Sequence, residues 1–438
     1  MAQFNKNEQD FLNQERTLFE VNMIANKNGE VVSTTNPFPV TGTVGISSET
    51  LITINPDTTS VDAFGRQRVA EPFTLGDYKH IYGLNVDFID SLSGSGSTVT
   101  FQSNQACARI TTGIGSTAYT VHQTKAYHHY QPGKSQLIFS SFNFHAPQQN
   151  ATKRTGYFDD RDGIYLEQVG LSTSNGVDVG IGTHNWVIRT YTSGIATETR
   201  IPQSQWNVDK CDGTGMSGFN IDFTKTQLAF IDFQWLGVGR VRCGFAHDGK
   251  LILAHEFLHS NKLDKVYISN PNLPVRCEVR NTGVGVGASM DQICSTVASE
   301  GGYSESGIDF SHSMVTTRTT LSPGGTEFPV MALRLKSNFN GLPNRLSARL
   351  NNLSIYAETN SISFRIIKLP GNAYIGLTTL GQGTIWTSAG DNSGVEYCTN
   401  ATVYSDGDEF AAGFVPSGAS QNSLSPVTLG SITNAKKM

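Results

Sequence analysis

The stretch that decides the fold covers residues 231–259 and reads IDFQWLGVGRVRCGFAHDGKLILAHEFLH. It fits two incompatible structures. Its last five residues, His255-Glu256-Phe257-Leu258-His259, have the H-E-x-x-H spacing of a zinc-protease helix. In its middle, Asp248-Gly249 lies between two apolar runs, which is a strong local signal for a β-hairpin. The helix would indicate a metallopeptidase, whereas the hairpin favours a structural protein.

The spacing of His255 and His259 separates the two structures. On a helix both rings lie on one face and reach one zinc ion at about 2.0–2.1 Å. On a strand they share a face but lie about 13 Å apart, which is too far for one ion. The longer zinc-protease motif needs a glycine and a histidine where this chain has Lys262 and Lys265. We therefore expect a hairpin, with no catalytic residue, metal ligand or cofactor, and a zinc hydrolase built on His255, Glu256 and His259 stays an alternative.

The composition restricts the classes of function. Charged residues are 16 % of the 438, against about 25 % in average soluble domains, and there are 44 glycines. This composition is typical of short strands joined by tight turns. The net charge of -5 offers no basic surface for nucleic acid, and no apolar run approaches the ~20 residues that cross a bilayer. The N-terminus lacks a signal-peptide pattern, and six scattered cysteines indicate free thiols of a protein made in a reducing cytoplasm.

Periodicity divides the chain into four parts. Residues 1–36 hold the one helical pattern, over 5–26, and this helix either packs on its own domain or docks on a neighbouring chain. Residues 37–75 read as an extended arm, because residues that precede prolines avoid the helical region. Residues 76–315 predict a large β-sandwich, and residues 316–438 predict a smaller C-terminal β-sandwich. The predicted fold is all-β, with two antiparallel, jelly-roll-like β-sandwich domains preceded by the N-terminal helix and the extended arm.

Alternating apolar and polar residues locate the strands of these domains. In the large sandwich we expect strands over residues 81–89, 136–144, 186–191, 228–235, 241–245 and 275–279. In the smaller one we expect them over residues 330–335, 346–350, 362–367, 384–387 and 395–398.

Other motifs of catalytic or binding sites have simpler explanations. Residues 213–218 spell G-x-G-x-x-G but lack the preceding strand and following helix of a dinucleotide site, so we expect a loop. Asp159, Asp160 and Asp162 could hold calcium, although a turn is favoured. A glycosidase needs two carboxylates about 5–10 Å apart, and the candidates by type are Glu167, Asp232 and Glu256. The four tryptophans could stack on sugar rings but are more often core residues in a sandwich.

Five segments carry a resemblance to a known group of proteins. They read DAFGRQRV (62–69) with EPFTL (71–75), GYFDD (156–160) with DGIYLEQ (162–168), DKCDGTG (209–215), QWLGVGRVR (234–242) and NPNLPVR (270–276). In this order they resemble virion structural proteins of tailed bacteriophages, especially marine and cyanobacterial phages, in their tail, baseplate or fibre-associated parts. The resemblance covers about residues 60–290 and implies a structural role without catalytic residues. The position in the particle stays open between baseplate, fibre, neck and capsid surface.

The sequence therefore predicts a virion component, made in the host cytoplasm, that acts by assembly with other virion proteins. We expect a homo-oligomer, and a trimer is favoured because fibrous phage parts often repeat threefold. The residues expected to mediate assembly lie in the N-terminal helix, the arm and the first shared segment: Phe11, Leu18, Phe19, Pro37, Phe38, Pro39, Phe64, Arg66 and Phe73. The alternative is a receptor-recognition adhesin that binds a host surface glycan through exposed aromatic side chains.

Overall fold

The fold was taken from a computed structural model of the chain. The chain divides into two compact units, residues 1–55 and residues 56–438. The structure describes residues 61–64, 66, 71–94, 96–170, 172–174, 177–179, 182–192, 194–284, 287–303, 307–314, 320–321, 327–350, 352–368, 385–402, 407–418 and 420–421. The expected helix over 5–26 and most of the expected arm lie outside these residues.

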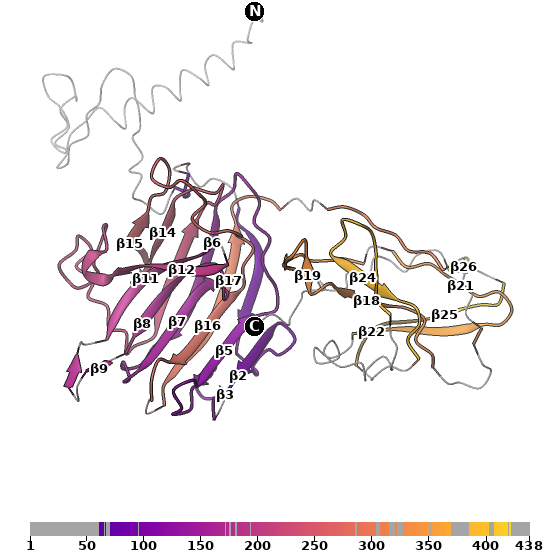
Figure 1. The fold of residues 1–438 in the computed structure, drawn as a ribbon, viewed down its shortest axis with the longest axis horizontal. Coiled ribbons are helices and arrows are strands. Elements are labelled where there is room, and N and C mark those ends of the chain that lie inside the picture. The colour runs from indigo at the N-terminus through magenta and orange to yellow at the C-terminus, as the bar shows by residue number, and fades with distance from the viewer. Residues whose placement is uncertain are drawn as a thin grey trace, which may run out of the picture. The chain divides into compact units, whose positions relative to one another are not determined.

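Two large antiparallel sheets are built from residues 73–299 (Figure 1). The eight-stranded sheet has the order β15-β14-β13-β6-β17-β4-β3, and β1 also pairs with β17. Its strands are β1 (Phe73–Lys79), β3 (Thr98–Gln102), β4 (Cys107–Thr111), β6 (Gln136–Asn143), β13 (Gln227–Phe233), β14 (Val241–His247), β15 (Lys250–Phe257) and β17 (Ser289–Ser299).

The seven-stranded sheet has the order β12-β11-β8-β7-β16-β5-β2. Its strands are β2 (Ile89–Ser93), β5 (Tyr119–Thr124), β7 (Ala151–Phe158), β8 (Gly163–Val169), β11 (Thr183–Thr192), β12 (Ile195–Pro202) and β16 (Val275–Asn281). A small hairpin, β9 (Ser172–Ser174) with β10 (Val177–Val179), and a single 3-10 turn, η1 (Gln203–Gln205), complete this part.

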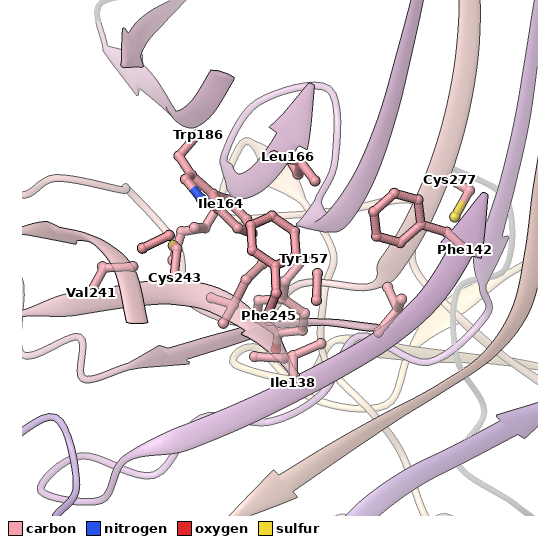
Figure 2. Close-up of a cluster of buried hydrophobic side chains, with 14 of the residues drawn as sticks. Ile138, Phe142, Tyr157, Ile164, Leu166, Trp186, Val241, Cys243, Phe245 and Cys277 are labelled. Carbon is pink, nitrogen blue, oxygen red and sulfur yellow. The ribbon is translucent and has the colours of Figure 1, made fainter. Parts of the chain in front are cut away.

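Both sheets contribute to one apolar core. Along β6, buried and half-buried residues alternate, as expected for a strand with one face on the core. Ile138 and Phe142 of the eight-stranded sheet join Leu166 and Trp186 of the seven-stranded sheet in this core. Figure 2 shows these side chains together with Tyr157, Val241 and Phe245. The two sheets therefore pack face to face as a β-sandwich.

Residues 332–421 form small antiparallel sheets. These are β18 (Ala332–Leu335) with β24 (Val395–Cys398) and β23 (Thr387–Ser388), β19 (Asn338–Phe339) with β20 (Leu342–Pro343), β21 (Ile355–Tyr356) with β26 (Ser420–Gln421), and β22 (Ile362–Lys368) with β25 (Asp408–Val415). The all-β, antiparallel class is thus confirmed, while the second sandwich stays a prediction.

Most predicted strands are present, and three are wrong. Residues 346–350 form no strand, in 81–89 only Ile89 belongs to one, and among the described residues of 384–387 only Thr387 does. Asn85 has a left-handed φ of 54°, and its carbonyl accepts the N–H groups of Phe88 and Ile89, so this segment turns instead of extending. Alternation alone does not reveal such a turn. Among the described residues, no helix is long and apolar enough to cross a membrane.

Candidate functional site

The deciding stretch folds as the predicted hairpin. β14 and β15 pair from Val241↔Phe257 to His247↔Lys250, and the turn residues Asp248 and Gly249 both have positive φ, at 49° and 73°. Positive φ at both positions is typical of the type I′ turns that join twisted strands. His255 therefore lies on a strand that ends at Phe257, and the helix required by the zinc-protease motif is absent from this segment.

The two histidines of the motif have separate structural partners. Nδ1 of His255 accepts the backbone N–H of Asn207 at 3.3 Å. Nδ1 of His259 donates to the carbonyl of Gly239 at 2.7 Å, and its ring stacks on Tyr267 with centroids 4.2 Å apart. Burial lowers the pKa of His255 to about 4 and also lowers the pKa of His259. Both rings are thus neutral packing groups at pH 7.

The same hairpin presents polar side chains on the face that points away from the core. Across the strands, Asp232 of β13 lies opposite Arg242 of β14, which lies opposite Glu256 of β15. Cross-strand partners point to the same face, so the three side chains form a row. Their neighbours Ile231, Val241 and Phe257 belong to the core, on the other face.

This row binds the chain's own residues 61–63, which we call the anchor segment. Arg240, immediately before β14, donates to the carbonyls of Asp62 at 3.1 Å and Ala63 at 3.0 Å. Arg242 donates to the carbonyl of Val61 and, through Nε, to Asp232 at 3.2 Å. All three anchor residues are buried, with at most 4 % of their surface exposed. Because their partners lie about 180 residues away, the contacts fix a tertiary position and not a local turn.

Ser135, the residue before the neighbouring strand β6, joins this anchor site. Its hydroxyl donates to Asp232 at 2.6 Å and accepts the N–H of Ala63 at 3.3 Å. Glu256 pairs with Arg240 at 3.3 Å. The buried carboxylate of Asp232 and the buried guanidinium of Arg242 therefore neutralise each other, and each has a further hydrogen-bond partner, Ser135 and the carbonyl of Val61 respectively. A stable buried charge requires both conditions.

The loop before β14 folds so that Arg240 reaches the anchor segment. Leu236 and Gly237 both have positive φ, and the N–H of Gly239 donates to the carbonyl of Trp235 at 2.8 Å. A Cβ on Gly239 would lie only 2.3 Å from the Gln234 side chain, so this close turn requires glycine. The segment 234–242 thus serves as a tight turn that ends in two guanidinium groups.

Two of the predicted assembly residues, Phe64 and Arg66, lie beside this site. The Asp62 carboxylate accepts the N–H groups of Phe64 and Arg66, and the Arg66 guanidinium lies over the Phe64 ring at 4.6 Å. Phe73 begins β1, is 43 % exposed and stacks on Tyr303 at 5.5 Å. The other predicted residues, Phe11, Leu18, Phe19, Pro37, Phe38 and Pro39, lie outside the described residues.

A second polar network lies on the outer face of the seven-stranded sheet. Arg154 of β7 joins Glu167 of β8 at 2.8 Å and Glu278 of β16 at 2.9 Å. Arg276 and Arg280 also pair with Glu278, and Arg200 pairs with Glu167 at 2.8 Å. Burial would raise the pKa of Glu278, but the guanidinium groups of Arg276, Arg154 and Arg280 hold it well below its usual range. Glu278 is therefore ionised and cannot act as a proton donor.

The carboxylate candidates for sugar hydrolysis are not brought together as a catalytic pair. Glu167 lies in the seven-stranded sheet, whereas Asp232 and Glu256 lie in the eight-stranded sheet. Asp232 and Glu256 share a face, about 10 Å apart across two strand spacings, but Arg242 stands between them. The anchor segment bonds to this same row through Arg240 and Arg242, so the place that a sugar would need is occupied by the protein chain.

The other motifs are structural turns. The Asp209 carboxylate accepts the N–H groups of Cys211 and Ser217, and a Cβ on Gly215 would collide with it, which explains the glycine-rich loop. The Asp159 carboxylate accepts the N–H groups of Arg161 and Asp162. Asp160 pairs with Arg276 at 3.0 Å. These carboxylates therefore already have hydrogen-bond donors as partners in a turn.

None of the four tryptophans offers an exposed ring. Trp186 and Trp206 are buried in the core. Trp235 is half-buried, and its Nε1 donates to the carbonyl of Ile268. Trp386 is half-buried, with the Arg334 guanidinium 3.9 Å from its ring centre. Two of the rings thus lie in the core, and the other two are only partly exposed.

Comparison with known proteins adds only a likeness of fold. No protein-family model matches the sequence, and no curated protein matches it. One similar solved structure is the CBM2 module of the evolved Dit of Lactobacillus casei BL23 phage J-1, with 9 % identity over 53 % of this chain and 99 % of that one, at a TM-score of 0.33. Another is a Bacillus licheniformis β-glucanase, with 11 % identity over 52 % and 98 %, at a TM-score of 0.31. At these identities and TM-scores the likeness bears on no activity.

Proposed function

We propose that this protein is a structural component of a tailed-phage virion, associated with the tail, baseplate or fibre, and that it acts by oligomeric assembly. One observation carries the proposal: the first and fourth shared segments bind each other at the anchor site. Arg240 and Arg242 of the fourth segment hold Asp62 and Ala63 of the first segment, and Val61 just before it. The sandwich thus binds residues 61–63, the point from which the N-terminal segment leaves it. We propose that the N-terminal segment docks on neighbouring subunits.

The other shared segments also have structural uses. Residues 156–168 form the β7–β8 hairpin, where a Cβ on Gly156 would lie 2.6 Å from the backbone of Ile164 and Tyr165. Residues 209–215 form the loop around Asp209, and Arg276 of residues 270–276 lies in the buried ionic network. Residue types that enzymes use for catalysis are used here for turns and ion pairs. This supports the building-block role that the resemblance implies.

The glycan-binding alternative has less support. It requires exposed aromatic rings, and the four tryptophans are buried or half-buried. Exposed aromatic rings remain as candidates, among them Tyr82, which is 96 % exposed, and Tyr356, which is 62 % exposed. Binding to a glycan array that disappears in Tyr82→Ala, while the fold is retained, would favour this alternative over assembly alone.

Complementation with an N-terminal deletion tests the assembly proposal. A phage that lacks the gene would be grown on cells that supply either the full chain or a chain without residues 1–40. Because the described sandwich begins after residue 60, we expect the deleted protein to keep its β-sheet circular dichroism and its cooperative unfolding. We also expect its level in purified particles to fall at least tenfold. Incorporation of the folded, deleted protein at the level of the full chain would contradict the docking role.

A further inference from the structure

Two buried histidines contact each other between the two sheets. His80 follows β1, and its N–H donates to the carbonyl of Ile293 in β17 of the eight-stranded sheet. His122 lies on β5 of the seven-stranded sheet, opposite Cys277, which belongs to the core. Each histidine is 1 % exposed, and the ring centroids are 5.2 Å apart.

Both rings use one nitrogen and leave the other without a partner. Nδ1 of His80 lies 3.3 Å from the carbonyl of Gly83, and Nδ1 of His122 lies 2.7 Å from the hydroxyl of Ser91. A carbonyl only accepts, so Nδ1 of His80 carries the proton and its Nε2 presents a lone pair. Nε2 of His80 and Nε2 of His122 are both buried without a hydrogen-bond partner. Leaving such groups unsatisfied is costly, so each such atom requires an explanation.

We propose that His80 and His122 bind a first-row transition-metal ion, with zinc as the reference ion, through their two Nε2 atoms. Imidazole nitrogen is a preferred ligand for such ions. In known sites the second ring nitrogen typically bonds to a carbonyl or another polar group, which is the arrangement of both Nδ1 atoms here.

The separation of the rings fits one shared ion. With a metal–nitrogen distance of about 2.0–2.1 Å, each ring centre lies about 3.2 Å from the ion, so a tetrahedral angle places the two centres about 5.2 Å apart. The two rings have that separation.

Water molecules would complete the coordination of the ion. Among the described residues, no group of three or more His, Cys, Asp or Glu side chains could hold a metal. Sites with water in an open position bind zinc with fewer protein ligands than closed structural sites. Here the ion would connect the segment after β1 to β5, and so would link the two sheets. It would also fix the start of the loop that carries the exposed side chains of Tyr82, Val86 and Phe88.

Zinc titration of the full chain, made without a histidine tag, tests the proposal. At pH 7.5 we expect calorimetry to show saturable binding of one zinc ion per chain and a rise in Tm with zinc concentration. His80→Gln and His122→Gln should each weaken binding at least tenfold. The matched control is His247→Gln, because His247 is an exposed residue at the tip of the hairpin and should leave binding unchanged.

X-ray absorption of the zinc-loaded wild-type protein gives a result that does not depend on how the variants fold. We expect the scattering pattern of two imidazole rings with oxygen in the remaining positions. A wild-type chain that binds no zinc saturably would overturn the proposal and leave a buried water molecule as the partner of both nitrogens. Undiminished binding in folded His80→Gln or His122→Gln, or a spectrum without imidazole, would overturn it equally.

Discussion

At the scale of single residues, Arg242 is the side chain on which the anchor site most depends. It lies in the outer-face row with Asp232 and Glu256, is 3 % exposed, and bonds both to Asp232 and to the anchor segment. Moving a guanidinium and a carboxylate out of water costs free energy, and only the attraction between the two charges offsets that cost. The identity of this residue is thus set by two partners, Asp232, 10 positions away, and Val61, 181 positions away.

Replacing Arg242 should therefore be among the most destabilising single changes. Arg242→Ala leaves the Asp232 carboxylate buried without its cation, and we expect the free energy of unfolding to fall by about 3–5 kcal/mol. Urea denaturation of the purified protein measures this change. The control is Lys79→Ala, which removes an exposed ion pair with Asp77 and should cause no measurable change. Equal stability of the two variants would show that the anchor site contributes little to the fold.

At the scale of elements, the β14–β15 hairpin depends on a bulge as well as on its turn. The pairing shifts register between Cys243 and Gly244. A Cβ on Gly244 would lie 2.1 Å from the carbonyl oxygen of Ile252 and 2.7 Å from the Phe230 ring. The backbone of the partner strand cannot move away cheaply, so only glycine fits at this position.

Gly244→Ala should therefore weaken the hairpin. We expect a loss of about 1–3 kcal/mol in the free energy of unfolding, which is the usual effect of overpacking. Gly302→Ala is the matched control, because a Cβ there meets no atom within 4 Å. Thermal unfolding of both variants makes the comparison. A Tm of Gly244→Ala equal to that of Gly302→Ala would mean that β14 and β15 pair differently.

The elements also show how far the sequence could be interpreted. Local signals were sufficient for the hairpin at Asp248-Gly249 and for strands such as β6 and β16, because alternation and turn residues act over a few positions. The strand order was not predictable, since β6 pairs with β13 and β17, which lie far along the chain. The false strand over residues 81–89 alternated correctly but contains the left-handed Asn85.

The candidate site was less predictable than the fold. Arg240, Arg242 and Asp62 all lie in segments singled out by resemblance, yet nothing local indicates that they bind one another. The pair of His80 and His122 was missed altogether, because the two residues lie on different sheets and have no motif spacing. The H-E-x-x-H sequence, by contrast, has the spacing of a known zinc motif, but on a strand its two histidines lie too far apart to bind one ion.

At the scale of the whole molecule, buried histidines make the stability depend on pH. Burial is the main cause that lowers the pKa of His122 to about 3, and it lowers the pKa of His128, His184 and His255 to about 4. Above an unfolded-state pKa of about 6.5 these rings are neutral in both states and have no effect. Below this pKa the histidines of the unfolded chain bind protons, whereas the buried histidines of the folded chain stay neutral. This difference favours unfolding.

We therefore expect the free energy of unfolding to decrease as the pH falls from about 6.5 to about 4. Urea denaturation at pH 7.5, 6 and 4.5 follows this decrease. His184→Gln should reduce the slope, provided that the variant folds at pH 7.5. A stability that stays constant or increases between pH 7.5 and pH 4.5 would contradict the neutral, buried state of these rings.

The central claim is that the whole molecule is a building block of a phage particle. The most direct test is quantitative mass spectrometry of particles purified on a density gradient, combined with gold labelling of the chain in electron micrographs. We predict a fixed number of copies per particle and gold at one place in the tail region. If the chain stays in the soluble fraction of the lysate and is absent from purified particles, the claim is wrong.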